Sequence, residues 1–472
     1  MADCPIGYTR RMEKIVSIIG AGLAGSEAAL QLARRGVRVR LHEMRPERRT
    51  DVHKTDACAE LVCSNSLKSM KPESAAGMLK AELEALDSLV YRCALDNAVP
   101  AGGALAVDRD KFSRAVTRLV EEDERIDLVR GEISSVAQAS RDADALIVAT
   151  GPLTSDALAD SLADVIGADY LAFYDAAAPI VMSDSLDMTK VFRQSRYEDS
   201  TDGEGHALGD YLNAPFTKEE YEAFANELIN ADRVIMRDFE TRDLFQACQP
   251  VEEIARKGVD APRFGALKPV GLTDPRTGRR PWAAVQLRAE DSDMTSYNLV
   301  GFQTNLKFGE QKRVFSMIPG LENAEFVRYG VMHRNTFIDA PRLLDANLQL
   351  ECATKALGLP VYVAGQLGGT EGYCEAIRSG LHAAISVAAK LNGMNAPGLP
   401  RETVFGALVD HATDPATVDY QPMHVNFGIM PALPDRIRNK QQRYAAYASR
   451  AIAALEGYCD ALAAAGLLEV SH

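Results

Sequence analysis

The sequence predicts an α/β protein in which a parallel-sheet domain is interrupted by a smaller α+β domain. Three observations carry this prediction. A buried apolar strand near the start runs straight into a glycine-rich turn and an alanine-rich helix. Further strand-and-glycine segments follow at residues 144–151 and 361–380, and the block between them has a different character. We expect residues 12–183 and 312–472 to form the main domain and residues 184–311 to form the inserted one.

The composition is that of a globular protein, with 47% hydrophobic and 25% charged residues in 472. A net charge of −14 argues against nucleic-acid binding through a generally basic surface, although a local basic patch remains compatible with it. No stretch reaches the length of a membrane span, and the first residues lack a signal-peptide core, so we expect a cytoplasmic protein with no membrane partner. The eight cysteines form no CxxC pair, which favours reduced thiols and no metal site.

The first unit has the order of a dinucleotide-binding fold. Ile15–Ile19 is a continuous apolar run, a helix reaches about Arg35, and an alternating strand ends at Glu43. Glycines at this turn allow a pyrophosphate to approach the helix N-terminus, and Glu43 can accept a hydrogen bond from a ribose hydroxyl. This predicts FAD or NAD rather than NADP. The candidate binding residues here are Gly20, Gly22, Leu23, Ala24, Gly25 and Glu43.

Two later segments favour FAD over NAD. Residues 144–151 form a buried strand that ends in Ala-Thr-Gly, as beside the dinucleotide in two-dinucleotide flavoproteins. Residues 361–380 read as a strand, a glycine turn and a helix that starts near Thr370, whose N-terminus can stabilise negative charge on a flavin. An ordinary βα crossover is the alternative. We expect a Rossmann-like FAD-binding domain, with further binding residues at Gly365, Gln366, Gly372 and Tyr373.

The inserted block carries its own signals. Thr217 and Glu220 form a capping box that predicts a helix over 217–229, and residues 282–291 and 297–305 alternate as strands. At the end of the chain, residues 435–468 predict an amphipathic helix with a basic first half.

Two cysteines are candidate reactive thiols. Cys63 lies in the string AELVCSNSLKS, and Cys248 lies just before a predicted helix in which Pro250 suits the first position and Gly258 the stop. A helix N-terminus stabilises a thiolate and lowers the pKa of a nearby thiol. The alternative for each cysteine is simple packing, because free cysteine is among the most buried residue types.

The chain resembles the bacterial folate- and FAD-dependent tRNA (uracil-5-)-methyltransferases from about residue 15 to residue 450. The matching strings are GAGLAGSEAA, AELVCSNSLKS, VPAGGALAVDR, FYDAAAPIV, RFGALKPVGL, YGVMHRNTFI and AGQLGGTEGY. The resemblance implies FAD, a methylene group from 5,10-methylenetetrahydrofolate, and reducing equivalents from FADH2 recharged by NAD(P)H. It implies C5-methylation of a tRNA uridine, at position 54 of the T-loop.

The resemblance also assigns residues. The two functional cysteines of the family fall on Cys63 and Cys248, and the histidine that stacks on the folate pterin falls on His333. A thiolate that adds to uracil C6 makes C5 nucleophilic, and a base must then remove the C5 proton. We assign Cys248 as the nucleophile and Cys63 as the base, with the order of the two roles left open.

An acidic protein must hold RNA through local cations. One candidate group is Arg276, Arg279 and Arg280 beside Trp282; the other is Arg436, Arg438, Lys440, Arg443 and Arg450 in the C-terminal helix. We favour Arg279 and Arg280, because they belong to the domain that carries Cys248.

The rival functions are the same chemistry on ribosomal RNA, a tRNA carboxymethylaminomethyl-modifying flavoprotein, and a non-catalytic FAD-binding RNA chaperone.

Overall fold

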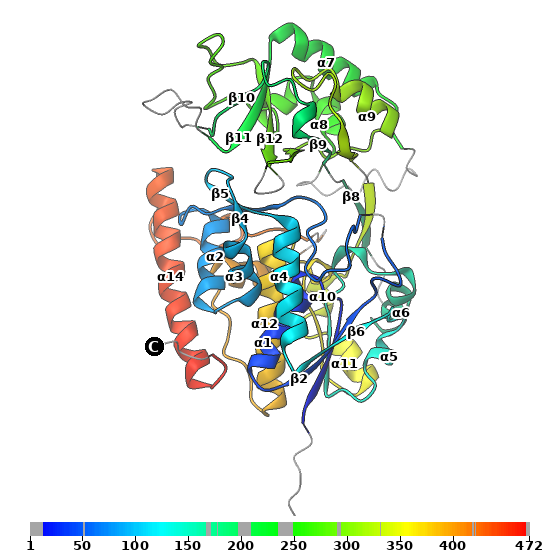
Figure 1. Cartoon of the computed structure of the whole chain (residues 1–472). Coiled ribbons are helices and arrows are strands. Elements are labelled where there is room, and N and C mark those ends of the chain that lie inside the picture. The colour runs from blue at the N-terminus through cyan, green and yellow to red at the C-terminus, as the bar shows by residue number, and fades with distance from the viewer. Residues whose placement is uncertain are drawn as a thin grey trace, which may run out of the picture.

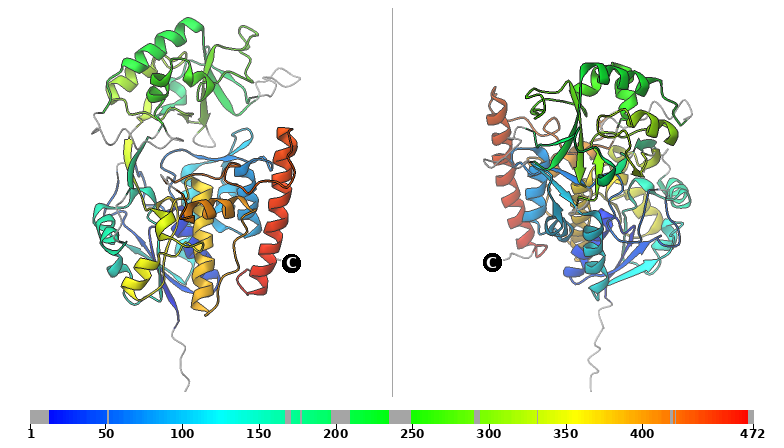
Figure 2. Two further views of the ribbon diagram at one scale, coloured as in Figure 1. Left: turned by 180° about the vertical axis from the view of Figure 1, so that it is seen from behind. Right: turned by 45° about the horizontal axis from the view of Figure 1, so that its top comes forward.

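The computed structural model describes residues 13–50, 52–166, 171–176, 178–196, 209–234, 249–289, 294–330, 332–417, 420 and 422–468. These residues form a main lobe, which holds both described ends of the chain, and an inserted lobe above it (Figure 1). Each lobe has its own large cluster of buried apolar side chains. Views from behind and from an inclined angle show the same division, with the C-terminal helix along one side of the main lobe (Figure 2).

The main lobe is organised around a five-stranded parallel sheet in the order β16-β7-β1-β2-β6. The central strands β7, β1 and β16 are mainly apolar because helices cover the sheet, and every residue of β7 is buried. The order is that of one half of a doubly wound dinucleotide-binding fold. The strand bounds are Ile15–Ile19 (β1), Arg38–Glu43 (β2), Ile126–Arg130 (β6), Ala145–Val148 (β7) and Val361–Val363 (β16).

Helices and a small antiparallel sheet complete the main lobe. The small sheet has the order β3-β5-β4, with strands Ser66–Ser69, Ala104–Val107 and Ala98–Val99. The helices are α1 (Leu23–Arg34), α2 (Ala75–Ala85), α3 (Leu89–Asp96), α4 (Arg109–Glu122), α5 (Val136–Ala139), α6 (Asp156–Ile166), α10 (Ala340–Leu343), α11 (Glu351–Leu357), α12 (Tyr373–Leu391), α13 (Val404–Thr413) and α14 (Lys440–Ala464).

Helices α1 and α12 pack against each other more closely than side chains normally permit. A Cβ atom placed on Gly380 would lie 2.1 Å from the backbone oxygen of Ala24, so only glycine fits at this point of α12. Gly25 meets a similar limit inside the first turn, where a Cβ atom would lie 1.9 Å from the oxygen of Gly20. The contact brings the N-termini of both helices to the same edge of the sheet.

The inserted lobe is built on a six-stranded sheet in the order β10-β11-β12-β13-β9-β14. Its strands are Ile180–Met182 (β9), Phe192–Arg193 (β10), Tyr211–Phe216 (β11), Ala283–Ala289 (β12), Ser296–Leu299 (β13) and Phe326–Arg328 (β14). Its helices are α7 (Lys218–Asn230), α8 (Val251–Lys257) and α9 (Phe308–Phe315). Because β9 and β14 belong to this sheet, we propose limits near residues 178 and 330 for the inserted domain, wider than 184–311.

A two-stranded antiparallel ribbon joins the lobes. It pairs β8 (Leu171–Ala176) with β15 (Met332–Phe337), so that the chain enters and leaves the inserted lobe side by side (Figure 1).

The element boundaries differ from the sequence prediction where a local bond or glycine decides them. The C-terminal helix starts at Lys440 rather than at residue 435, because Asn439 caps it by accepting a hydrogen bond from the Gln442 N–H. The strand expected over 297–305 ends at Leu299, since Gly301 turns the chain with a φ of 77°. The capping box of Thr217 and Glu220 is present with both of its hydrogen bonds.

Glu252, in the first turn of α8, is a fully buried acid. Its carboxyl group accepts hydrogen bonds from the Asn305 N–H at 2.6 Å and the Thr304 hydroxyl at 3.0 Å. Burial raises the pKa of Glu252 to about 7, against smaller opposing effects from these hydrogen bonds. The carboxyl group therefore holds α8 to residues 304–305 of the loop that follows β13.

We predict that Gly380→Ala lowers the free energy of unfolding by about 1–3 kcal/mol, because the added methyl group forces α1 and α12 apart. Gly457→Ala is the matched control, since Gly457 is an exposed α14 residue with open space around its Cβ position. That substitution should stabilise the chain by about 0.5–1 kcal/mol. Urea denaturation of both variants measures this, and a stabilised Gly380→Ala variant would contradict the close contact.

We predict that Glu252→Gln removes a pH dependence of stability. An acid whose pKa is higher in the folded state stabilises the fold at low pH, and this contribution is lost as the pH rises from about 4.5 to about 7. The loss amounts to about 3 kcal/mol. Denaturation curves at several pH values should show the variant gaining stability relative to the wild type as the pH rises. Parallel curves would mean that Glu252 is not the titrating group.

Candidate functional site

The glycine turn after β1 leaves the N-terminus of α1 open. Gly20 has a φ of 100°, and a Cβ atom there would lie 2.7 Å from the Ala149 oxygen, so the turn requires glycine. Gly22 is the N-cap of α1 and has nothing within 4 Å of its Cβ position. The backbone N–H groups at the start of this helix can therefore be approached by an anionic ligand.

Glu43 ends β2 beside this turn and is 5% exposed. One carboxylate oxygen accepts a hydrogen bond from the Ala21 N–H at 3.1 Å, and the other accepts from the N–H and the side chain of Arg45. Burial alone would raise the pKa of Glu43, but the hydrogen bonds and charge of Arg45 outweigh it and lower the pKa. The group is ionised at neutral pH, and a carboxylate with three donors retains capacity for a further one.

A cavity of about 90 Å³ lies against Gly20, Gly22 and Glu43. His42 also lines it, and both nitrogens of that ring are buried without a hydrogen-bond partner among the described residues. Burial lowers the pKa of His42, so the ring is neutral at pH 7. A buried ring with an unmet hydrogen-bond capacity beside an open cavity is suited to a polar ligand.

A second cavity, of about 530 Å³, adjoins the first, because both are lined by Gly22, His53, Ala149, Thr150 and Leu153. It reaches across the sheet edge to the N-terminus of α12. Predicted residues that line it are Gly22, Leu23, Ala24, Cys63, Gly365, Gln366, Gly372 and Tyr373. Together the two neighbouring cavities reach from Glu43 to Tyr373.

Tyr373 fixes the position of the Cys63 segment. The backbone N–H groups of Cys63 and Ser64 both donate to the Tyr373 hydroxyl oxygen at 3.0 Å. Burial raises the pKa of Tyr373 above its usual range, so the hydroxyl stays protonated. The first residue of α12 therefore holds the loop that places Cys63 in the cavity wall.

Sequence reasoning missed several polar residues in the same wall. The Glu375 carboxylate lies 3.7 Å from the Lys68 ammonium, and His424 lies 3.9 Å from Glu371. The acids Glu371 and Glu375 could have been found from their place around the start of α12. His424 and Gln303 come from distant segments, and nothing in the sequence joins them to this site.

A third cysteine, Cys374, also lines the larger cavity. It is 3% exposed, and burial raises the pKa of its thiol to about 11. The Cys374 thiol is therefore protonated at neutral pH and is a poor nucleophile.

Cys248 lies outside the described residues, but the helix predicted after it is present. Pro250 is the N-cap of α8 rather than its first residue, and Glu252 and Glu253 lie in the first turn. The Val251 N–H donates to the Gln303 oxygen at 2.8 Å, and Gln303 lines the larger cavity. The described start of α8 is thus joined to a residue of the cavity wall.

His333 lies in β15, opposite Asp175 of β8, and its side chain is outside the described part of the chain. Strand β15 packs beside the turn Gly151–Leu153 (η1), whose residues line the larger cavity. The backbone position of His333 is therefore on an element next to the cavity.

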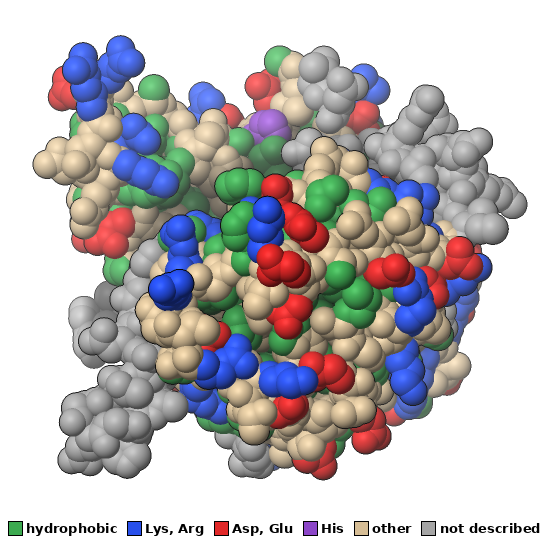
Figure 3. Space-filling view, turned by 90° about the horizontal axis from the view of Figure 1, so that it is seen from above, with side chains coloured by type: hydrophobic (Ala, Val, Ile, Leu, Met, Phe, Trp, Pro, Cys, Tyr) green, Lys and Arg blue, Asp and Glu red, His purple; other side chains and the backbone are tan. Residues whose placement is uncertain are grey.

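Arg279 and Arg280 are exposed in a turn of the inserted lobe and do not line either cavity. The turn is closed by a hydrogen bond from the Asp274 N–H to the Arg279 oxygen, and Arg276 forms an ion pair with Asp274 at 2.8 Å. In the second basic group, Arg443 and Arg450 donate to loop carbonyl oxygens. In the view of the molecule from above, basic and acidic side chains are interspersed over the surface (Figure 3).

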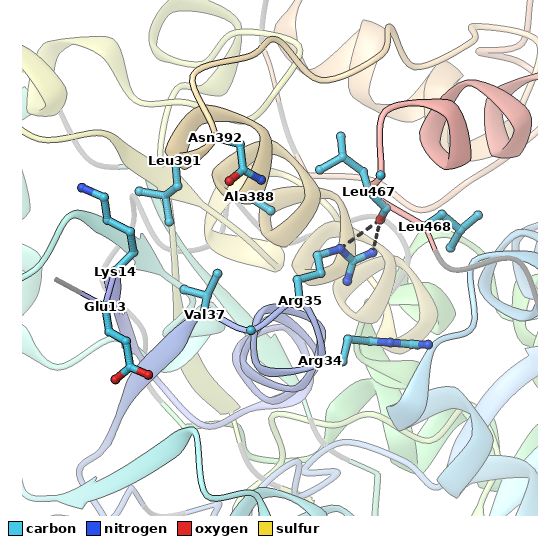
Figure 4. A pocket seen from close by; sticks show the side chains of 12 residues that line it. Glu13, Lys14, Arg34, Arg35, Val37, Ala388, Leu391, Asn392, Leu467 and Leu468 are labelled. Carbon is cyan, nitrogen blue, oxygen red and sulfur yellow. Dashed lines mark hydrogen bonds between the residues drawn. The ribbon is translucent and has the colours of Figure 1, made fainter. Parts of the chain in front are cut away.

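A separate cavity of about 490 Å³ lies at the opposite edge of the sheet (Figure 4). Arg35 crosses it and donates to the Leu467 oxygen at 2.6 and 3.0 Å. Lys14 forms an ion pair with Asp144, and Arg34 with Asp87. This cavity adjoins residues that precede β1 and β2, whereas ligands of such folds bind beyond the carboxyl ends of the strands.

Two negative findings apply to the described part of the chain. It contains no group of three or more His, Cys, Asp or Glu residues placed to hold a metal ion. None of its helices has both the length and the apolarity of a membrane span.

Comparisons with known proteins identify the family. A family model described as glucose inhibited division protein A matches residues 15–395. The methylenetetrahydrofolate–tRNA-(uracil-5-)-methyltransferase TrmFO of Acetivibrio thermocellus is 50% identical over 443 residues, which cover 94% of this chain and 98% of that protein. The protein of the same name from Listeria monocytogenes is 48% identical over 451 residues, which cover 96% and 100%.

A solved structure supports the fold. GidA of Aquifex aeolicus aligns with a TM-score of 0.68 and 17% identity, over 97% of this chain and 74% of that one. With the parallel sheet, this confirms the predicted α/β class with a Rossmann-like FAD-binding domain. From the identity and coverage of its relatives, the chain belongs to the TrmFO family of methyltransferases.

Proposed function

We propose that this protein is a flavoenzyme that methylates C5 of a uridine in tRNA, with 5,10-methylenetetrahydrofolate as the carbon donor. The observation that carries the proposal is the larger cavity, in which Cys63 shares one wall with the glycine turn of α1 and the N-terminus of α12. The curated relatives named for this reaction support it through about 50% identity over nearly the whole chain.

FAD fits the two adjoining cavities. The Gly22 backbone and the N-terminus of α1 are suited to its pyrophosphate, and the ionised Glu43 to a ribose hydroxyl. Gly365, Gln366, Gly372 and Tyr373 would surround the flavin end, where the N-terminus of the 19-residue helix α12 favours negative charge. When bound and reduced, FAD supplies the electrons that convert the bridging methylene group into a methyl group.

The folate would occupy the remainder of the larger cavity. The volume of the whole larger cavity is within the range of small-molecule sites, and the cavity lies beside η1 and the neighbouring strand β15. We propose His333 of β15 as the residue that stacks on the pterin, and NAD(P)H as the source of electrons for the flavin.

The two thiols divide the chemistry on the base. Addition of the Cys248 thiolate to uracil C6 gives an enolate whose C5 attacks the electrophilic methylene carbon. Cys63 then removes the C5 proton, and tetrahydrofolate leaves with the electrons of its nitrogen–methylene bond, so that C5 carries an exocyclic methylene group. The hydride that reduced FAD would supply adds to this methylene carbon as the Cys248 sulfur leaves C6, which gives the methyl group and restores the aromatic base. Tyr373 supports the second role, because it holds the Cys63 backbone at the cavity wall. Cys374 takes neither role, since burial keeps its thiol protonated.

The RNA would contact the inserted domain through Arg279 and Arg280, which are exposed, while Arg276 is engaged by Asp274. A base must leave its stack to reach a thiol, which favours a loop over a duplex. We propose uridine 54 of the T-loop, the position that the family resemblance implies, as the target, and the cytoplasm, where tRNA is found, as the location.

We predict that Cys248→Ala abolishes both methyl transfer and the covalent adduct with RNA that contains 5-fluorouridine. Cys63→Ala should abolish methyl transfer and still form the adduct, because fluorine at C5 blocks only the proton-removal step. Turnover and denaturing gels measure the two properties. Cys352→Ala, a change in α11, is the control and should leave both intact.

The opposite pattern, with the adduct lost in Cys63→Ala and kept in Cys248→Ala, would exchange the two roles. Wild-type protein that carries FAD and reduces it but methylates no uridine in tRNA would contradict the proposed function.

A further inference from the structure

The inserted lobe displays an aromatic ring to solvent. Phe264 is 81% exposed, more than any other large hydrophobic side chain in the described part of the chain. It ends the short 3-10 turn η4 (Ala261–Phe264), in which Pro262 is buried. The Pro262 oxygen accepts hydrogen bonds from the Gly265 and Leu267 N–H groups, so the backbone that carries the ring is held firmly.

The residue beside it anchors the turn to the sheet. The guanidinium group of Arg263 lies 3.6 Å from the centre of the Trp282 ring, and its Nε donates to the Trp282 oxygen at 3.1 Å. Lys218 lies 5.5 Å from the same ring centre. Two cations already contact the Trp282 ring, which is therefore poorly suited to stack on a base. Phe264 presents the open aromatic face.

Exposed cations flank this anchor. Arg280 is two residues before Trp282, and Arg279 precedes it. Phe264 directly follows Arg263, and Arg280 is two residues from Trp282, so the chain holds both close to the Arg263–Trp282 contact. Two other cations near this contact have acidic partners, since Arg263 pairs with Asp260 and Lys218 with Glu222. The exposed guanidinium groups of Arg279 and Arg280 therefore supply the local positive charge.

A single open ring beside cations matches the way proteins hold single-stranded nucleic acid. Bases stack on aromatic side chains whatever their sequence, while nearby arginines hold the phosphates. A protein partner would instead need a broad apolar patch, whereas among the described residues the large exposed apolar side chains near Phe264 in the sequence are Val259 and Val270, at 41% and 36%.

We propose that Phe264 stacks on an unpaired base of the RNA substrate, next to phosphates held by Arg279 and Arg280. This inference rests on the proposed function for the identity of the RNA. It adds a contact that orients the RNA loop on the inserted domain and that does not depend on charge.

The test is tRNA affinity across a salt series. Phe264→Ala should weaken binding about tenfold at every salt concentration, with an unchanged slope, because stacking releases no counterions. Phe264→Tyr should restore binding, since its ring also stacks. Arg279→Glu combined with Arg280→Glu should weaken binding and flatten the slope. Phe308→Ala is the matched control, a 57% exposed ring that stacks on Tyr329 at 5.3 Å, and should bind as the wild type.

Equal affinity of Phe264→Ala and the wild type would overturn the proposal, as would failure of Phe264→Tyr to restore binding. Bound flavin and the melting temperature should not change, which separates a lost contact from a lost fold. If the wild type binds tRNA but does not methylate it, the proposed function fails while the binding series still decides the role of Phe264.

Discussion

The arrangement of the site depends on the close contact between α1 and α12. Gly380 brings the middle of α12 to the backbone of Ala24 near the start of α1, a distance at which no side chain fits. As a result, Gly22 and Gly372, the N-caps of these two helices, line one cavity. Two helix N-termini that converge on one space favour a ligand with negative charge at two separate points, as in reduced FAD, which carries it on the pyrophosphate and on the flavin ring.

The two lobes contribute different chemistry. The main lobe places Cys63 in the cavity and fixes it through the Tyr373 hydroxyl. The inserted lobe reaches the same cavity through Gln303, which is hydrogen-bonded to the start of α8. Buried Glu252 strengthens that link between α8 and the loop after β13. An RNA bound to the inserted lobe would thus be presented to a cofactor held by the main lobe.

The sequence alone predicted the parts of the site that are local in the chain. The Gly20–Gly25 turn, Glu43 and the turn before Tyr373 could be recognised because strand, glycine and helix follow one another directly. His424, Gln303 and Lys68 could not, since only folding brings them to α12. Arg263 was missed for the same reason, because its contact with Trp282 spans nineteen positions of sequence. Helix α14 was placed too early, since Asn439 and not the basic pattern decides its start.

The central claim is that the open space before α1 is a site for the pyrophosphate of FAD, and Gly22→Val tests it most directly. Gly22 has a φ of −73° and nothing within 4 Å of its Cβ position, so the Cβ atom of a valine meets no protein atom. We predict that FAD titration of the apoprotein gives one tight site per wild-type chain and a strongly weakened one in the variant, with equal melting temperatures of the two apoproteins. A variant that folds normally and binds FAD as tightly as the wild type would contradict the account.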